Sequence, residues 1–217
     1  ARLGRPVRVA NDADCFALSE AIDGAGADAP VVFGVILGTG VGGGVVVHGR
    51  PLAGPSGLAG EWGHNRLDPA QETPPAAIAD VVAAFGTRAC YCGRSNCVET
   101  WLSGPGLTDL YRELGGADDV GAEALAARRE SDRAAALALD VYAWLLARAL
   151  ATVINVLDPH VIVLGGGVSG LAALYERVPE MWSRWVFGGE THTRLLPAQH
   201  GDSGGVRGAA WLWPPDG

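Results

Sequence analysis

Three of the four cysteines in this chain fall within eight residues, and a histidine lies upstream of them. Zn²⁺ takes four tetrahedral thiolate and imidazole ligands, and a short knuckle containing glycine can fold several sulfurs onto one ion. We therefore predict a structural zinc site with the ligands His64, Cys90, Cys92 and Cys97. A disulfide or inert buried thiols are the alternatives, although cysteines two residues apart are poorly placed to bridge each other. Cys15 lies far from this group and is expected to be a small buried residue.

Two carboxylates flank the predicted metal site. Glu61 lies three residues before His64, and Glu99 lies two residues after Cys97. A zinc ion at this position would anchor the loop that carries Glu61 and the helix start that carries Glu99. We expect the metal to hold a polar pocket in shape rather than to take part in chemistry.

Two glycine-rich runs follow apolar segments of strand length. Residues 38–44 lie between the valine-rich segments 31–37 and 45–47, as in a β-hairpin with a nearly bare tip, and residues 165–167 follow the apolar segment 161–164. Bare backbone offers N–H donors to a phosphate, and ligands of open α/β sheets collect at the carboxyl ends of strands. An ordinary glycine-rich hairpin is the alternative for the first run. The predicted nucleotide-binding residues are Gly38, Thr39, Gly40, Val41, Gly42, Gly43, Gly44, Gly165, Gly166 and Gly167.

An Asn-Asp pair follows the short segment 7–10, which reads as a strand, and begins a predicted helix. Together with the glycine loops and the polar pocket, the pair suggests phosphoryl transfer to a small polar acceptor. Such transfer needs positioning, charge neutralisation and a base for the incoming hydroxyl. Asp12 is the candidate base, and Asn11 is placed to bind neighbouring hydroxyls. Capping of the helix is the alternative role for Asp12.

The remaining segments place these residues in an α/β protein. We expect strands at 31–37, 45–47, 161–164 and 194–196, and helices at 15–21, 107–114, 118–130, 134–157, 171–185 and 204–212. Residues 68–78 are expected to form a surface excursion. Residues 134–157 could be mistaken for a membrane span, but Asp140 and Arg148 within them favour a buried helix.

Composition excludes several classes of protein. The 217 residues include 32 glycines, and 48% of the residues are hydrophobic, which suits an α/β domain with tight loops and a substantial core. A net charge of −8 argues against a nucleic-acid partner. Few cysteines, mostly assigned to metal, suit the cytoplasm, and residues 1–6 do not resemble a signal peptide.

These motifs together resemble the ROK family (repressor, open reading frame, kinase). The resemblance covers nearly the whole chain, and the combination of glycine runs with the cysteine knuckle is specific. It is carried by Leu3-Gly4-Arg5-Pro6-Val7, Asn11-Asp12-Ala13, Leu37 to Gly44, Gly60-Glu61-Trp62-Gly63-His64, Cys90 to Glu99, Gly165 to Ser169, and His200 to Gly205.

The resemblance implies an actin-like ATPase or ribonuclease H-like α/β fold with two lobes closing on ATP and sugar. Residues 1–29 would be the end of the N-terminal lobe with the catalytic Asp, and residues 30–217 the C-terminal lobe. By the same likeness Asp12 is the catalytic base, and Asn11, Asp12, Glu61, His64 and Glu99 contact the sugar. The resemblance also implies Mg-ATP as co-substrate, a structural zinc ion and a homodimer. The implied reaction is phosphorylation of the 6-hydroxyl of N-acetyl-D-glucosamine in the cytoplasm.

Two departures from the family pattern limit these expectations. The family's Asp-x-Gly-Gly-Thr phosphate loop is absent, and the chain has no initiating Met, so we expect a fragment with little or no kinase activity by itself. Asn96 stands where the knuckle usually has glycine, and Asn also adopts left-handed conformations. A sugar-sensing ROK repressor, or a ROK kinase for glucose, fructose or N-acetylmannosamine, is the alternative function.

Overall fold

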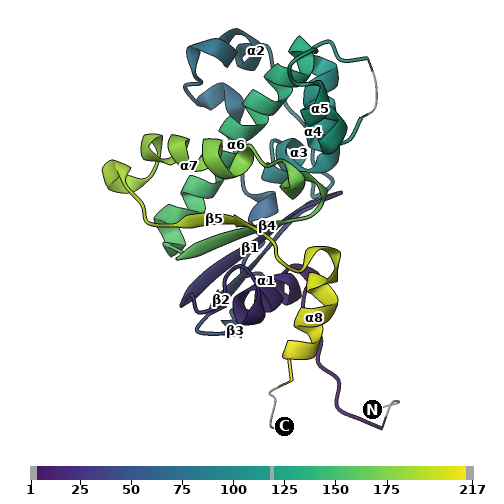
Figure 1. The fold of residues 1–217 in the computed structure, drawn as a ribbon, viewed down its shortest axis with the longest axis vertical. Helices are drawn as coiled ribbons and strands as arrows, with labels where there is room; N and C mark the ends of the chain where they lie inside the picture. Colours follow the sequence, from purple (N-terminus) through teal and green to yellow (C-terminus); the bar gives the residue numbers. More distant parts are fainter. Residues whose placement is uncertain (1–3, 118–119, 214–217) are drawn as a thin grey trace.

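A five-stranded mixed sheet forms the centre of the molecule (Figure 1). The computed structural model describes residues 4–117 and 120–213. The strand order is β3-β2-β1-β4-β5, with β1 at Val31–Leu37, β2 at Val41–Val47, β3 at Arg50–Pro51, β4 at Val161–Gly165 and β5 at Arg194–Pro197. β1 pairs with β2 as an antiparallel hairpin and with β4 in parallel, and β4 pairs with β5 in parallel.

The central strands are buried on both faces, which explains their nearly continuous apolar sequences. Successive side chains of a strand point to opposite faces. In β4, Ile162 and Leu164 therefore join the larger core, whereas Val161 and Val163 join the smaller one. The sheet thus separates two hydrophobic cores.

Most helices cover the face of the sheet that carries the larger core (Figure 1). The long helix α6, Arg133–Leu157, is central, and Trp144 and Tyr142 on it are fully buried. It is long and apolar enough to cross a membrane, yet the fold buries most of it, as expected of a core helix. Around it lie α2 (Ala79–Ala83), α3 (Val98–Leu102), α4 (Gly104–Glu113), α5 (Ala122–Arg128) and α7 (Leu174–Met181).

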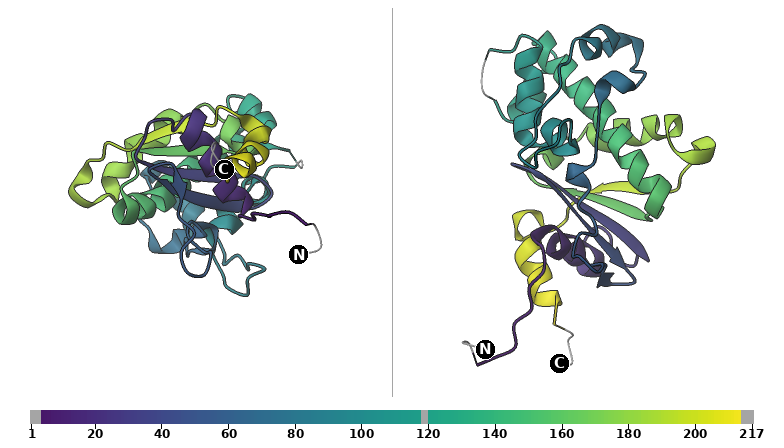
Figure 2. Two further views of the ribbon diagram at one scale, coloured as in Figure 1. Left: turned by 90° about the horizontal axis from the view of Figure 1, so that it is seen from below. Right: turned by 180° about the vertical axis from the view of Figure 1, so that it is seen from behind.

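Two helices far apart in the sequence pack together on the opposite face. They are α1, Asp12–Asp23, and α8, Gly204–Trp211, which lie side by side in Figures 1 and 2. A Cβ on Gly208 would lie 1.6 Å from the carbonyl oxygen of Cys15, so only glycine permits this approach. Phe16 and Leu18 of α1 fill the smaller core against the sheet. The helix that carries Asp12 is therefore fixed between the sheet and α8.

The predicted strands at 31–37, 161–164 and 194–196 and the long helix are confirmed. The predicted strand at 7–10 is wrong, because Val7 and Val9 are exposed and no strand of the described residues pairs with them. The second strand of the hairpin begins at Val41 rather than Val45. Part of the helix predicted at 118–130 lies outside the described residues, and the rest is α5, with Leu125 fully buried.

Residues 68–78 are partly ordered by packing. Within the described residues, the short 3₁₀ helices are Trp62–His64, Pro69–Gln71, Ala76–Ile78, Gly167–Gly170, Trp182–Arg184, Phe187–Gly189 and Gly201–Ser203. Pro69 and Ile78 are buried, and Glu72 forms an ion pair with Arg148 of α6. The expected surface excursion is therefore attached to the core helix.

Candidate functional site

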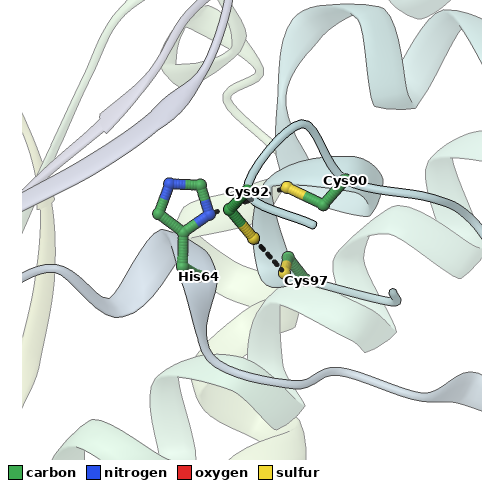
Figure 3. Close-up of side chains that lie close together, drawn as sticks. All are labelled: His64, Cys90, Cys92 and Cys97. Atoms are coloured by element: carbon green, nitrogen blue, oxygen red, sulfur yellow. Dashed lines mark hydrogen bonds between the residues drawn. The ribbon is translucent and has the colours of Figure 1, made fainter. Parts of the chain in front are cut away.

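Four potential metal ligands converge between the short helix Trp62–His64 and the start of α3 (Figure 3). Cys90 Sγ lies 3.6 Å from His64 Nδ1, and Cys92 Sγ lies 3.6 Å from Cys97 Sγ. The ligand atoms of all four residues lie within 4.8 Å of one another. A tetrahedron with Zn–S of about 2.3 Å and Zn–N of about 2.1 Å has edges of about 3.6–3.8 Å, so the spacing suits zinc.

The thiols of this cluster differ in their ease of ionisation. Hydrogen bonds from the backbone and side chain of Arg94 lower the pKa of Cys92, whereas burial raises the pKa of Cys97. Metal ligands bind as thiolates, so a cation that neutralises the cluster would favour deprotonation of both residues. The donor set thus fits a divalent cation that prefers sulfur.

A tight turn holds the knuckle in shape. Cys90 N–H donates to the carbonyl of Arg94 at 2.8 Å, and Asn96 Oδ1 accepts a hydrogen bond from Arg88 N–H at 2.8 Å. Asn96 has φ +52°, which confirms that Asn takes the left-handed position expected for glycine. These hydrogen bonds hold the turn that carries the three sulfurs of the cluster.

Glu99 connects this knuckle to the tip of the β1–β2 hairpin. Its Oε2 accepts a hydrogen bond from Val41 N–H at 3.0 Å. A Cβ on Gly40 would lie 2.5 Å from the same oxygen, so the glycine leaves space for the carboxylate. The glycine tip, the first turn of α3 and the cysteine knuckle therefore form one connected unit.

Glu61 is joined in turn to the start of α1. Asn11 Nδ2 donates to Glu61 Oε1 at 3.2 Å, and Asn11 Oδ1 caps the helix by accepting from Ala13 N–H at 2.8 Å. Asp12 is exposed next to this pair, and its Oδ1 also accepts from Ala13 N–H, at 2.9 Å. The structure thus places Asn11, Asp12 and Glu61 together, with His64 three residues beyond Glu61.

Asp14 is a residue of this group that the sequence did not single out. Burial, followed by the negative charges of Glu61 and Asp12, raises its pKa. Its Oδ1 is buried without a hydrogen-bond partner among the described residues. Asp14 follows Asn11 by three positions and so lies on the same side of the first helical turn, which is the signal that could have identified it.

Tyr91 is a second residue that was missed. It lies between two predicted ligands, is 82% exposed, and its hydroxyl is 3.0 Å from His64 Nε2. The charge of Glu99 is the main cause that raises the pKa of this phenol. Its position within the knuckle was the only signal available in the sequence.

The predicted phosphate loop is divided between a turn and a strand. Gly38, Thr39 and Gly40 form the tip of the hairpin, and Gly42, Gly43 and Gly44 lie within β2. A Cβ on Gly44 would lie 2.5 Å from the carbonyl oxygen of Ala13, and a Cβ on Gly43 would lie 2.7 Å from that of Gly60. These strand glycines allow α1 and the segment before Glu61 to pack directly on the backbone of β2.

The two glycine-rich runs meet at one open cavity of about 610 Å³. Gly38, Thr39 and Gly167 line it together with residues of α4 and α5. Thr39 also lines a neighbouring cavity of about 370 Å³, which Tyr91 and Glu99 reach from the knuckle. The structure therefore brings the predicted nucleotide-binding loops next to the predicted sugar-binding residue Glu99, whereas Asn11, Asp12 and Glu61 line neither cavity.

Comparison with known proteins gives consistent results. The model of a family described as the ROK family matches residues 1–215. An N-acetyl-D-glucosamine kinase from Salmonella paratyphi B is 41% identical over 212 residues, which are 98% of this chain and 68% of that protein.

Solved structures of ROK proteins are also similar. A ROK hexokinase from Thermus thermophilus has a TM-score of 0.78 and 32% identity, covering 96% of this chain and 65% of that one. A ROK glucokinase from Streptomyces griseus, solved with glucose and AMPPNP, has a TM-score of 0.77 and 28% identity over 97% and 69%. A ROK transcriptional regulator has a TM-score of 0.76 and 25% identity over 96% and 52%. The chain thus spans about two thirds of the length of these kinases.

Proposed function

Because this chain belongs to the ROK family, we propose that it is the acceptor-binding part of an ATP-dependent sugar kinase. The acceptor would be N-acetyl-D-glucosamine, phosphorylated at its 6-hydroxyl. The observation that carries this proposal is the hydrogen bond between Asn11 and Glu61. Asp12 follows Asn11 directly, so this hydrogen bond supports a base beside the segment that carries Glu61 and that the His64 cluster would anchor.

The proposed reaction is an in-line displacement at the γ-phosphorus of ATP. The 6-hydroxyl oxygen forms the new bond to phosphorus, the bond to the bridging oxygen breaks, and ADP leaves. Asp12 accepts the hydroxyl proton as the new bond forms. Asn11, Glu61, His64 and Glu99 would bind the other sugar hydroxyls, for which carboxylates are suitable acceptors.

The glycine runs would hold the nucleotide. Two cavities that share Thr39 support this role, because Gly38 and Gly167 line one of them and Glu99 lines the other. Mg²⁺ accompanies ATP in such reactions and neutralises charge on the phosphates. Of the predicted residues 38–44 and 165–167, Gly38, Thr39 and Gly167 would lie against the nucleotide. Val41 N–H already donates to Glu99, and Gly42, Gly43 and Gly44 belong to the paired strand β2.

Zinc would have a structural role. His64, Cys90, Cys92 and Cys97 would hold it, and it would fix the segments that carry Glu61 and Glu99. The proposal also includes a cytoplasmic homodimer without a nucleic-acid partner. Residues 1–29 would be the end of an N-terminal lobe, and residues 30–217 the C-terminal lobe.

A substrate panel tests the proposed activity. Release of ADP by the full natural chain is measured with N-acetyl-D-glucosamine, glucose, fructose and N-acetylmannosamine. We expect the highest kcat/KM for N-acetyl-D-glucosamine. A higher kcat/KM for another sugar would identify that sugar as the acceptor. The absence of turnover with every sugar would refute the proposed kinase activity.

A sugar-sensing repressor is the second candidate. The similarity to a ROK transcriptional regulator supports it. A sensor needs the sugar contacts but has no use for a base such as Asp12. Binding of the full natural chain to DNA, relieved by sugar and without ADP release, would favour the repressor.

A further inference from the structure

Of the described residues that line the cavity shared by the two glycine-rich runs, only Glu123 is charged. It lies in the first turn of α5 and is exposed. Within the part of the chain that the structure describes, its carboxylate forms no hydrogen bond or ion pair. The cavity is proposed for a triphosphate, whose negative charge repels a carboxylate, so Glu123 needs a different partner on the ligand.

The tip of the β1–β2 hairpin connects this cavity to the side of the molecule that carries the knuckle. Thr39 of the tip also lines the neighbouring cavity that Glu99 reaches, so the transferred phosphate would lie near Thr39. Gly104 N–H donates to the carbonyl of Gly38 at 2.7 Å, which holds the start of α4 against the tip. The phosphate end of the cavity is therefore the end at the hairpin tip and the start of α4.

The first turns of α4 lead from this tip to α5. Thr108, one turn beyond Gly104, also lines the cavity and donates to the carbonyl of Val120 at 3.2 Å, three residues before Glu123. Gly167, from the second glycine run, belongs to the 3₁₀ helix against which α5 packs. Glu123 and Gly167 therefore line the part of the cavity where the nucleoside of ATP would lie.

The chemistry of a nucleoside matches a free carboxylate. The ribose of ATP carries two neighbouring hydroxyls, each of which can donate a hydrogen bond, and an ionised carboxylate has two oxygens that only accept. An acidic side chain binds a ribose hydroxyl in the same way in dinucleotide-binding folds. The triphosphate, by contrast, offers acceptors and negative charge, which a carboxylate cannot bind.

We propose that Glu123 selects ribonucleotides by accepting hydrogen bonds from the 2′- and 3′-hydroxyls of the ribose. This inference rests on the proposed kinase function and adds a specificity-determining residue on its nucleotide side. The ribose lies against the first turn of α5, and the triphosphate extends along the start of α4 toward Thr39.

Deoxynucleotides test this role. Binding of ATP, 2′-deoxy-ATP and 3′-deoxy-ATP to the full natural chain is measured by calorimetry. We expect wild type to bind ATP about tenfold more tightly than either deoxynucleotide, as for loss of one hydrogen bond to a charged group. In Glu123→Ala the affinity for ATP should fall at least about tenfold, and the preference for ATP over the deoxynucleotides should disappear. In turnover, KM for ATP should rise with little change in kcat.

A matched glutamate controls for the loss of a charge in a helical first turn. Glu176 is exposed in the first turn of α7 and does not line this cavity, so Glu176→Ala should keep the preference for ATP. Glu123→Gln, which retains one acceptor oxygen, should fall between wild type and Glu123→Ala. A merely structural role in α5 would lower the affinity for ATP and for the deoxynucleotides by the same factor.

Inorganic tripolyphosphate separates the two ends of the cavity. It carries the phosphates without a nucleoside, so wild type and Glu123→Ala should bind it with affinities within about twofold of each other. Tighter binding by Glu123→Ala would show that the carboxylate faces the phosphates, because its removal would relieve repulsion.

The outcomes distinguish this inference from the proposed function. Wild type without a preference for ATP, a preference that persists in Glu123→Ala, or tighter binding of tripolyphosphate by this variant would overturn the role of Glu123 and leave the kinase standing. Wild type that binds neither ATP nor a deoxynucleotide would refute the nucleotide site of the proposed function and, with it, this inference.

Discussion

Asp12 is the residue on which the proposed chemistry depends most directly. We expect Asp12→Asn in the full natural chain to bind sugar nearly as well as wild type. Its kcat should fall by about 10²–10⁴-fold, because general base catalysis typically contributes this much. Sugar binding by calorimetry and steady-state release of ADP measure the two effects.

A matched change elsewhere controls for altered charge. Asp28 is exposed and lines a cavity with Pro159 and Arg194 at the start of β5, and its φ of +65° is one that Asn also adopts. Asp28→Asn should keep full turnover. A near-normal kcat for Asp12→Asn would remove Asp12 from the role of base.

Asp14 gives a prediction about pH and stability. Burial and the nearby charges raise its pKa in the folded protein, so its ionised form disfavours folding. The stability of wild type therefore falls as the pH rises through this raised pKa. The full stability is present only below the pKa of Asp in the unfolded state, which is about 3.9. We expect Asp14→Asn to have a higher Tm than wild type at pH 7.

This gain should shrink as the pH falls and should vanish near pH 3, where both proteins carry a neutral side chain. Thermal unfolding at a series of pH values measures it. A gain in Tm that stays constant with pH would show that packing, rather than ionisation, causes the effect.

At the scale of elements, the cysteine knuckle and the β2 glycines position these residues. We expect Cys97→Ala to lower the zinc content of freshly purified protein below half an equivalent, because a structural site needs all four ligands. Loss of the metal should also expose residues 86–96 to proteolysis, since the knuckle would no longer be fixed.

The fourth cysteine provides the control. Cys15 is buried in α1, far from the cluster in sequence and absent from it, so Cys15→Ala should retain a full equivalent of zinc. Elemental analysis before and after chelation compares the two variants. Less than half an equivalent in unchelated wild type would count against the metal site itself.

Gly44 tests the contact between α1 and β2. A Cβ there would lie 2.5 Å from the carbonyl oxygen of Ala13 and 2.8 Å from the Cα of Asp14. Gly44→Ala must displace the first turn of α1, so we expect a loss of about 1–3 kcal/mol of stability. It should also lower kcat, because Asp12 lies on that turn. Gly86→Ala, where a Cβ would meet open space, should change neither the denaturant midpoint nor turnover.

The secondary structure could be predicted from the sequence better than the packing of one element on another. Apolar runs identified β1, β4 and α6 because burial on both faces leaves a continuous signal. The prediction of a strand at 7–10 was wrong. Val7 and Val9 give a strand-like pattern in the sequence, but both are exposed in the fold. Cysteine spacing identified the knuckle, whereas the packing role of Gly42 to Gly44 depended on α1 and Gly60, whose positions only the folded backbone shows.

At the scale of the whole molecule, α1 and α8 bring the two ends of the described chain together. Gly208 permits their backbones to touch, and Asp23 of α1 is hydrogen-bonded to His200 and forms an ion pair with Arg207. These contacts join residues separated by about 180 positions. The orientation of the helix that carries Asp12 therefore depends on the segment 198–211.

Glu20 is the strongest of these long-range connections. It is fully buried, and its carboxylate accepts hydrogen bonds from the N–H groups of Ala25, Gln199 and His200 at 2.9–3.0 Å. Removal of the acceptor leaves three buried or partly buried donors without a partner, each costing about 1–3 kcal/mol where water cannot replace it.

We expect Glu20→Ala to lose roughly 3–5 kcal/mol of unfolding free energy in denaturant titrations. Glu176→Ala, at an exposed position of α7, should stay within about 0.5 kcal/mol of wild type. Hydrogen exchange should show faster exchange at residues 199–200 in Glu20→Ala while α6 remains protected. Wild-type exchange at these amides would mean that water or another acceptor replaces Glu20, and the link between α1 and the segment before α8 would then rest on Asp23 and Gly208.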